Sequence, residues 1–120
     1  HPEVDEEIDN LMLEEASESD CVIDGRLMSY LYEDEAFRIH LTVPIIVAAK
    51  RNSKRDKIEL ATTVCNLRER RELNNQRYLD LYNVDVSDLS VYDLVLNTQY
   101  YPKKEMNELI LEIVKKALRA

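Results

Sequence analysis

The 120-residue chain contains a single glycine, Gly25. Glycine enters left-handed backbone conformations at little steric cost, and two-residue β-hairpin turns depend on it. One glycine therefore disfavours a hairpin-rich all-β fold, and it rules out a glycine-rich phosphate loop within these residues. With 45% hydrophobic and 33% charged residues, the composition is that of a soluble globular domain, and the length corresponds to about one domain.

The charge balance and the cysteines exclude several function classes. The chain carries 24 acidic and 16 basic side chains, a formal net charge of -8. A nucleic-acid surface needs clustered excess Lys and Arg, and a membrane span needs about 18 consecutive apolar residues, so neither partner is expected. Cys21 and Cys65 lie far apart without a CxxC pattern. They indicate neither a zinc site nor a disulfide framework, and they fit a reducing cytoplasm.

Helical and strand-like segments alternate along the chain. Apolar spacing predicts helices over residues 4–16, 27–32, 44–55 and 56–82, and from residue 102 onward. Pro44 is expected at the first position of its helix, and Asp56 with Glu59 as a capping box for the next one. Short apolar runs predict strands over residues 21–23, 37–43 and 92–97. Because these runs lack alternation and lie between helices, the predicted fold class is α/β, a parallel sheet flanked by helices in a single domain over 1–120.

The end of the first predicted strand carries charged side chains. In open parallel sheets, ligands bind beyond the carboxyl ends of the strands, and Asp24, Gly25 and Arg26 stand there. An acid at this place can hold a metal-bound water, and an arginine can hold a phosphate through two parallel hydrogen bonds. An ordinary strand-to-helix turn with a surface arginine explains the same tripeptide, and spacing alone favours that simpler interpretation.

A second group of cations, Lys50, Arg51, Lys54 and Arg55, follows Pro44 on the predicted helix. Arg51 and Arg55 are one turn apart and share a helix face. Such spacing suits the binding of anionic oxygens. A solvated face paired with nearby acids is the alternative, and for charge runs it is the commoner explanation.

The third group lies in the segment LRERRELNNQRY, where Arg70, Asn74 and Arg77 stand at i, i+4 and i+7. At about 100° per residue the three fall within a narrow arc of the helix. This arc borders an apolar stripe, so the two arginines emerge at the edge of the buried face, where a cleft can form. Salt bridges to neighbouring acids are the alternative, and the pattern favours the cleft and the salt-bridge interpretations about equally.

The order of these motifs resembles the archaeal-type cytidylate kinases of the nucleoside monophosphate kinase family. The matching stretches are PEVDEEID, CVIDGRL, FRIHLTVPIIVAAKRNSKRD and LRERRELNNQRYLDLYNVDVSDLSVYDLVLNT, followed by a closing helix. The resemblance implies a P-loop kinase fold. The family begins with a strand and a phosphate loop, G-x-x-x-x-G-K-[ST], and neither is present here. The resemblance therefore implies that these 120 residues are the later portion of a longer kinase.

The resemblance also implies an activity: phosphoryl transfer from ATP to CMP or dCMP with Mg²⁺. Nucleotides are then the expected partners, and a monomer the expected assembly. Asp24 is implied near the metal, through water, and Asp24, Gly25 and Arg26 are implied as substrate-binding residues, with Arg26 at the phosphate or the base of the acceptor monophosphate. Arg51 and Arg55 are implied as catalytic residues in a basic lid at about residues 48–57.

The long helix carries the remaining implied roles. Arg70 is implied as a further catalytic residue, and Arg70 and Arg77 face the nucleotides. Asn74 stands where relatives usually carry an acid thought to help read the cytosine, so the base preference stays open. Ala48 stands where relatives tend to carry an arginine, which predicts a weaker grip by the lid. The alternative from another class is a non-catalytic nucleotide- or partner-binding module derived from a kinase fold.

Overall fold

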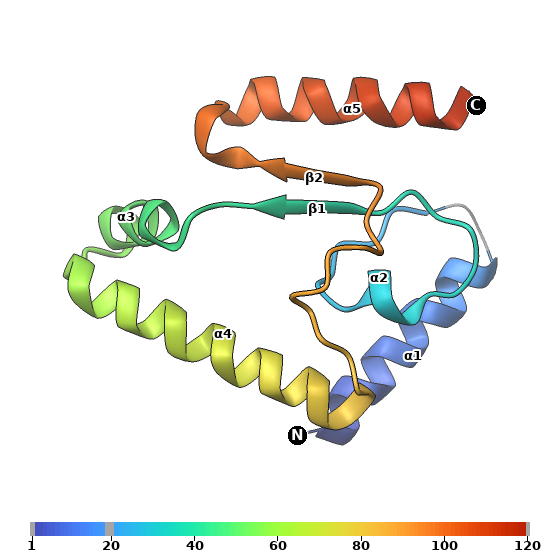
Figure 1. The fold of residues 1–120 in the computed structure, drawn as a ribbon, viewed down its shortest axis with the longest axis horizontal. Helices are drawn as coiled ribbons and strands as arrows, with labels where there is room; N and C mark the ends of the chain where they lie inside the picture. The colour runs from blue at the N-terminus through green and yellow to red at the C-terminus, as the bar shows by residue number, and fades with distance from the viewer. Residues whose placement is uncertain (1, 19–20, 120) are drawn as a thin grey trace.

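The computed structural model describes residues 2–18 and 21–119, and the side chains of residues 6–15 and 21–118. Five helices and two strands are assigned in these ranges (Figure 1). The helices are α1 (Pro2–Glu18), α2 (Met28–Leu31), α3 (Ile45–Asp56), α4 (Leu60–Tyr82) and α5 (Lys103–Arg119); the strands are β1 (Ile39–Thr42) and β2 (Leu94–Asn97), and a 3-10 turn, η1 (Thr98–Tyr100), follows β2. Each predicted helix is present, with shifted ends.

The two strands pair in parallel, with Ile39 opposite Leu94 and Thr42 opposite Asn97. The parallel sheet and the α/β class are thereby confirmed. Both strands are shorter than predicted, because pairing is limited to the four residues that face each other. Beyond the carboxyl end of β2, the Thr98 hydroxyl donates to the Thr42 carbonyl at 3.3 Å and continues the connection between the two strands.

The predicted strand over residues 21–23 is wrong. These residues have no regular secondary structure, and Val22 is 99% exposed. A strand forms only where its backbone groups find partners in a neighbouring strand. In the part of the chain that the structure describes, β1 and β2 pair with each other and no strand pairs with residues 21–23. An apolar run alone does not supply that partner.

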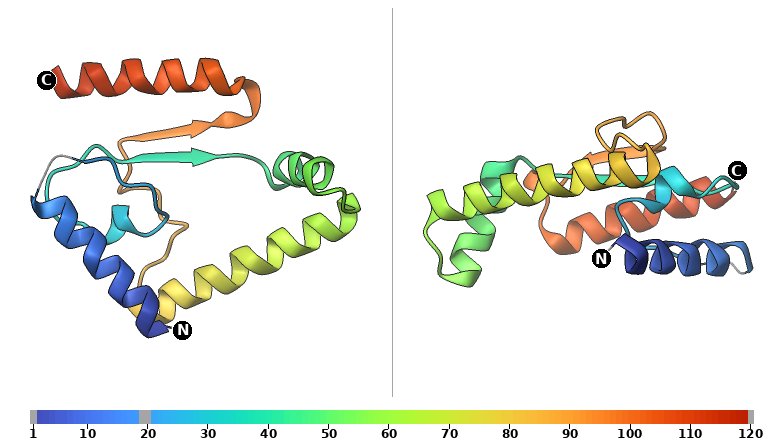
Figure 2. Two further views of the ribbon diagram at one scale, coloured as in Figure 1. Left: turned by 180° about the vertical axis from the view of Figure 1, so that it is seen from behind. Right: turned by 90° about the horizontal axis from the view of Figure 1, so that it is seen from below.

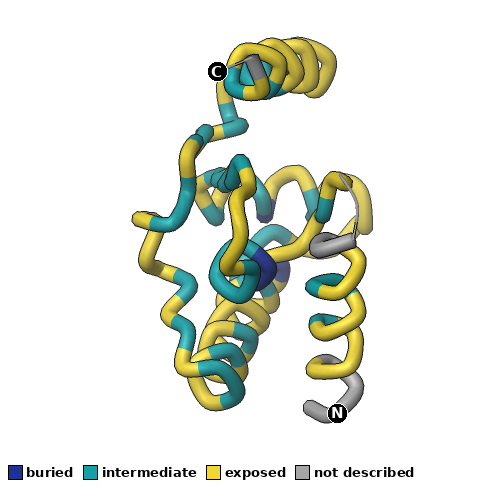
Figure 3. Tube along the Cα trace, turned by 90° about the vertical axis from the view of Figure 1, so that its right-hand side faces the viewer, coloured by how far each residue is buried: buried dark blue, intermediate teal, exposed yellow. Residues whose placement is uncertain are grey.

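The elements enclose an open framework rather than a dense core. In Figures 1 and 2, α5 runs beside β2, while α4 and α1 slant away on the far side of β1 with α2 between them. The radius of gyration is 16.2 Å, against about 13.6 Å for a compact domain of this length. The buried apolar side chains among the described residues are Leu27, Met28, Ala49 and Met106 (Figure 3). The side chains of Val4 and Ala16, predicted for the apolar face of α1, lie outside the described residues.

The junction between α3 and α4 differs from the predicted capping box. Asp56 is the last residue of α3, and α4 begins at Leu60 after Glu59, which makes no side-chain cap. Between them Lys57 adopts a left-handed conformation, φ 57°, and its N–H donates to the Ser53 carbonyl. The chain therefore leaves the helix before Glu59 and cannot form the box. Pro44 is likewise the N-cap of α3, with Ile45 as its first residue.

Two side chains attach α2 to the rest of the molecule. The Arg38 guanidinium donates to four carbonyls around the end of α2, those of Ser29, Tyr32, Asp34 and Ala36, at 2.6 to 3.3 Å. The Tyr30 hydroxyl lies 2.7 Å from the Asp88 carbonyl oxygen and 3.0 Å from that of Val86. Burial, and next the neighbouring Tyr92, raise the pKa of Tyr30 above its usual range. These contacts fix α2 against β1 and the loop after α4.

No helix within the described ranges is both long enough and apolar enough to cross a membrane.

Candidate functional site

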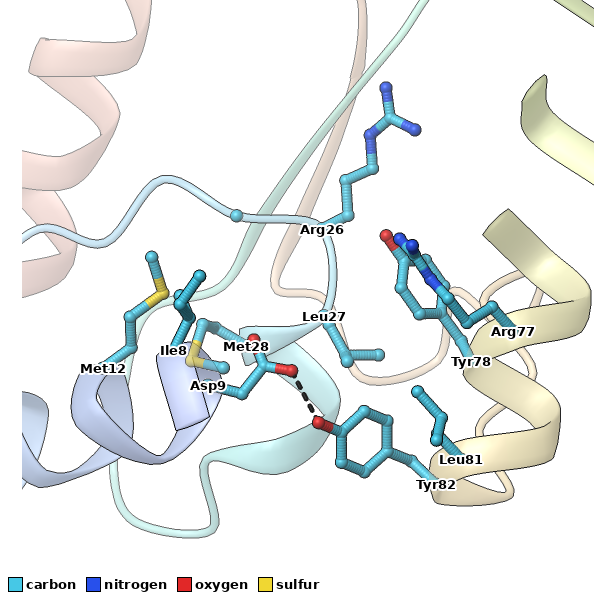
Figure 4. Close-up of a pocket in the computed structure, with 11 residues that line it drawn as sticks. Ile8, Asp9, Met12, Arg26, Leu27, Met28, Arg77, Tyr78, Leu81 and Tyr82 are labelled. Carbon is cyan, nitrogen blue, oxygen red and sulfur yellow. Dashed lines mark hydrogen bonds between the residues drawn. The ribbon is translucent and has the colours of Figure 1, made fainter. Parts of the chain in front are cut away.

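A cavity of about 170 Å³ lies where α1, the start of α2 and the last turns of α4 meet. Its walls are largely apolar, and they include Leu27 and Met28, two of the few buried side chains among the described residues. The site is therefore built on the best-packed part of α2. Its lining residues are Ile8, Asp9, Met12, Gly25, Arg26, Leu27, Met28, Arg77, Tyr78, Leu81 and Tyr82 (Figure 4).

Two arginines from distant segments line this cavity. Arg26 comes from the turn before α2, and Arg77 from α4. The Arg77 guanidinium lies 5.6 Å from the centre of the Tyr78 ring, within cation–π range. Its Nη2 also donates to Asn74 Oδ1 at 3.3 Å. Of the residues singled out in the sequence, Gly25, Arg26 and Arg77 are thus brought together at one cavity.

The opposite end of the cavity holds a hydrogen-bonded pair. The Tyr82 hydroxyl donates to Asp9 Oδ2 at 2.7 Å, joining α4 to α1 across 73 positions of sequence. Figure 4 shows this pair below Leu27, while the Arg26 and Arg77 side chains stand above it. The cavity is therefore cationic at one end and acidic at the other, with apolar side chains between.

Neither the backbone conformation nor the space around position 25 requires a glycine. No glycine in the described residues has positive φ. A Cβ at this position would meet Met28 Cγ at 3.7 Å, an ordinary contact. Residue 25 therefore needs no glycine-specific backbone conformation in this structure. Asp24, beside it, is exposed and does not line the cavity.

The arginines of the predicted lid lie elsewhere. Arg51 and Arg55 are exposed on α3, at the far end of α4 from the cavity (Figure 1). Arg55 forms an ion pair with its neighbour, Nε to Asp56 Oδ1 at 2.9 Å. This hydrogen bond raises the pKa of Arg55 and lowers that of Asp56. Arg70 is exposed on α4 and does not line the cavity.

Sequence reasoning missed Asp9, Tyr78 and Tyr82 as site residues. Asp9 is one of many acids in its segment, and nothing in the local spacing distinguishes it. Tyr78 and Tyr82 are four residues apart and therefore share a face of α4, and both line the cavity together with Arg77. That spacing was an available signal, because a tyrosine beside an arginine at the edge of an apolar stripe offers both stacking and a hydrogen bond.

The cytidylate kinase-like family profile matches residues 3–100. The chain belongs to this family. It is 40% identical over 118 residues to a cytidylate kinase of Pyrococcus horikoshii, covering 98% of this chain and 59% of that protein. A cytidylate kinase of Thermococcus kodakarensis is 41% identical over 101 residues, and one of Methanocaldococcus jannaschii is 37% identical over 102. These matches cover 84% and 82% of this chain, and 52% and 57% of the respective proteins.

The chain thus spans a little over half the length of the curated relatives it matches. No solved structure matches it. The predicted family is confirmed by these comparisons.

Proposed function

We propose that the full-length protein transfers a phosphoryl group from ATP to CMP or dCMP. The observation that carries this proposal is the cavity shared by Arg26 and Arg77, which come from segments about fifty positions apart in the chain. Membership of the cytidylate kinase-like family supports it. The parallel pairing of β1 and β2 supports a P-loop kinase fold for the whole protein.

The two arginines suit the acceptor monophosphate. A guanidinium presents paired N–H donors that match phosphate oxygens, and it stays charged at every physiological pH. Leu27, Leu81 and Tyr78 line the space next to these cations, which limits water around a bound phosphate. Phosphoryl transfer depends mainly on positioning and on neutralising charge, so this arrangement serves the reaction directly.

We assign the predicted lid and Arg70 to the binding of the phosphoryl donor, ATP. Arg51 and Arg55 stand on α3, whose junction with α4 at Lys57 offers a place for the lid to turn. Arg55 would exchange its exposed partner Asp56 for phosphate oxygens on closure. Arg70 lies two turns before Arg77 on α4, between the lid and the cavity, and is assigned to the transferring phosphoryl group.

Binding of ATP and of Mg²⁺ requires groups other than the arginines named above. Only one glycine is present, so a G-x-x-x-x-G-K-[ST] loop for the ATP phosphates must be supplied from outside the 120 residues. Among the described residues no group of three or more His, Cys, Asp or Glu could hold a metal. Mg²⁺ is commonly held by one or two carboxylates plus water and phosphates, and the exposed carboxylate of Asp24 fits one such place. When bound, Mg²⁺ would neutralise phosphate charge.

A coupled assay of the full-length protein with ATP, Mg²⁺ and CMP tests the proposal. We expect turnover with CMP, and a fall in kcat/KM of about 10²-fold or more for Arg26→Ala and for Arg77→Ala, because each removes a charged donor from the phosphate site. Arg71→Ala is the matched control, since Arg71 is exposed on the same helix and does not line the cavity. Absence of turnover with every monophosphate would refute the kinase, and faster turnover with AMP would refute the cytidylate preference.

A further inference from the structure

The acidic end of the cavity, at Asp9, is not used by the proposed phosphate site of Arg26 and Arg77. Asp9 is half-buried, and its Oδ2 accepts the hydrogen bond from Tyr82. No described cation forms an ion pair with Asp9, and Oδ1 accepts no hydrogen bond from a described residue. A carboxylate that is held in place by one oxygen and open at the other is suited to accept a hydrogen bond from a ligand.

The position of this carboxylate matches the shape of a nucleotide. A nucleoside monophosphate is dianionic at its phosphate and neutral, with directional polar groups, at its base. The cavity has guanidinium groups at one end, the Asp9 carboxylate at the other, and Leu27 and Leu81 between them (Figure 4). With its phosphate at Arg26 and Arg77, the ligand would direct its base toward Asp9.

We propose that Asp9 determines which base is accepted, by receiving a hydrogen bond from the exocyclic amine of cytosine. This inference rests on the proposed function. Cytosine presents an N4 amino donor, for which a carboxylate is the matching acceptor. Uracil presents a carbonyl oxygen at the same position, which would face the carboxylate oxygen without a proton between them. The site therefore selects against uracil through repulsion as well as for cytosine through attraction.

Asn74 does not take this role in the structure. Its side-chain oxygen accepts the hydrogen bond from Arg77, and Asn74 is not among the residues that line the cavity. Among the lining residues that the structure describes, Asp9 is the one that carries a carboxylate. Tyr82 acts as a positioning residue, because its hydroxyl fixes Asp9 Oδ2 and leaves Oδ1 directed elsewhere.

The test compares CMP with UMP in the full-length protein. We expect Asp9→Asn to lower the ratio of kcat/KM for CMP to that for UMP by about tenfold or more, mostly through the KM for CMP. The amide can turn its NH₂ toward the uracil carbonyl, so the KM for UMP should fall. Glu7→Gln is the matched control: it removes an exposed carboxylate from the same helix, outside the cavity, and should leave the ratio unchanged.

Tyr82→Phe provides a second, milder variant. It keeps the Asp9 charge and removes only the positioning hydroxyl, so the ratio should fall by a smaller factor than in Asp9→Asn while kcat for CMP changes little. Circular dichroism checks that each variant is folded. Should Asp9→Asn fail to fold, Tyr82→Phe decides the matter through the same ratio.

The outcomes separate the two proposals. Turnover of CMP with an unchanged CMP-to-UMP ratio in Asp9→Asn and in Tyr82→Phe overturns the role of Asp9 and leaves the kinase intact. Absence of turnover with all monophosphates overturns the kinase, and calorimetric titration with CMP and UMP then decides base selection on its own. Equal affinity of the wild-type protein for the two nucleotides would overturn the role of Asp9, and a CMP preference that Asp9→Asn abolishes would support it.

Discussion

The two ends of α4 are held in different ways. At the cavity end, contacts join residues that are far apart in the chain: Tyr82 with Asp9 across 73 positions, and Tyr30 with Val86 across 56. At the other end, the corner of α3 and α4 (residues 45–63), Ala49 is buried, but the ion pair found there joins two neighbours in the sequence, Arg55 and Asp56. Side chains at the cavity end are therefore held by contacts between distant segments, whereas those at the corner are held by contacts between neighbours in the sequence.

This difference agrees with the proposed function, in which the cavity would bind the acceptor and the corner would act as a lid. An acceptor site gains from being formed before the ligand arrives, because the cost of ordering its side chains is already met by folding. A lid must instead open and close, and exposed side chains on a local corner can change partners at little cost. The comparison predicts that removing a hydrogen-bonding side chain alters stability at the cavity end, whereas the matched removal at the corner does not.

The largest expected effect on stability is that of Arg38→Ala. The change removes a guanidinium that donates to four carbonyls around α2, and the two partly buried ones, those of Ser29 and Tyr32, are left without this donor. We expect a loss of about 2–4 kcal/mol in the free energy of unfolding, measured by urea denaturation. Arg55→Ala at the corner is the control and should change it by less than about 0.5 kcal/mol. Equal effects of the two variants would contradict the comparison.

Periodicity predicted the helices, because a helix depends on spacing within a short segment, and the runs at 37–43 and 92–97 contain the two strands that pair in parallel. The prediction failed for an apolar run that has no partner strand. The apolar run at 21–23 reads as a strand, yet a strand needs a neighbour, and Val22 is exposed. It failed also at the capping box of Asp56 and Glu59, because Lys57 leaves the helix between them. Spacing cannot show where a backbone turns.

Sequence reasoning singled out two arginines that line the cavity, Arg26 and Arg77, but it did not single out Asp9. Arg26 and Arg77 were marked by their place after an apolar run and beside an apolar stripe, and the structure brings both to one cavity. Asp9 carries no such mark, because its importance arises only when α1 meets α4. The roles of Arg51 and Arg55 remain predictions, since they concern a lid in its closed state, and the role of Arg70 remains one because Arg70 does not line the cavity.

A smaller effect is expected for Tyr30→Phe. The hydroxyl is close to the carbonyls of Val86 and Asp88, and its removal leaves both without this donor. We expect a loss of about 1–2 kcal/mol by urea denaturation. Tyr100→Phe is the control, because Tyr100 is 76% exposed and should be neutral. A neutral Tyr30→Phe would show that the loop after α4 is held by other contacts.

Tyr30 also makes stability depend on alkaline pH. Burial raises its pKa above the usual value, so the unfolded chain releases this proton at lower pH than the folded protein does. The contribution is fully present below about pH 10, the ordinary tyrosine pKa, and is lost as pH rises beyond it. Unfolding midpoints measured between pH 8 and about pH 11 should therefore fall less steeply in Tyr30→Phe than in the wild-type protein. Parallel curves would contradict this.

The helix ends give a further comparison of the two regions. Lys57 at the corner and Asn83 at the cavity end both have left-handed backbone, with φ of 57° and 55°. A left-handed conformation strains lysine more than asparagine, so Lys57→Gly should stabilise the protein by about 0.5–1 kcal/mol and Asn83→Gly by less. Thermal denaturation measures both. Lys57→Ala, which keeps the strain, is the control and should give no gain. A larger gain at Asn83 would reverse the expected order.

The smallest expected effect concerns acid. Hydrogen bonds from the Ser87 hydroxyl and N–H lower the pKa of Asp85, and those from Ser90 lower the pKa of Asp88. Because the folded pKa values lie below the unfolded value of about 3.9, the stabilisation is present above about pH 4 and is lost as pH falls further. Both side chains are exposed, so each contribution is small.

Replacing both aspartates by asparagine keeps a side-chain oxygen for each turn and removes the titration. The double variant should lose less stability than the wild-type protein between pH 5 and about pH 3, measured by urea midpoints at each pH. Asp56→Asn makes the same test at the corner, where the hydrogen bond from Arg55 lowers the pKa. High salt should weaken the Asp56 effect more, because an exposed ion pair is screened whereas the hydrogen bonds within the loop after α4 are not. Equal salt sensitivity would remove this distinction between the two ends of α4.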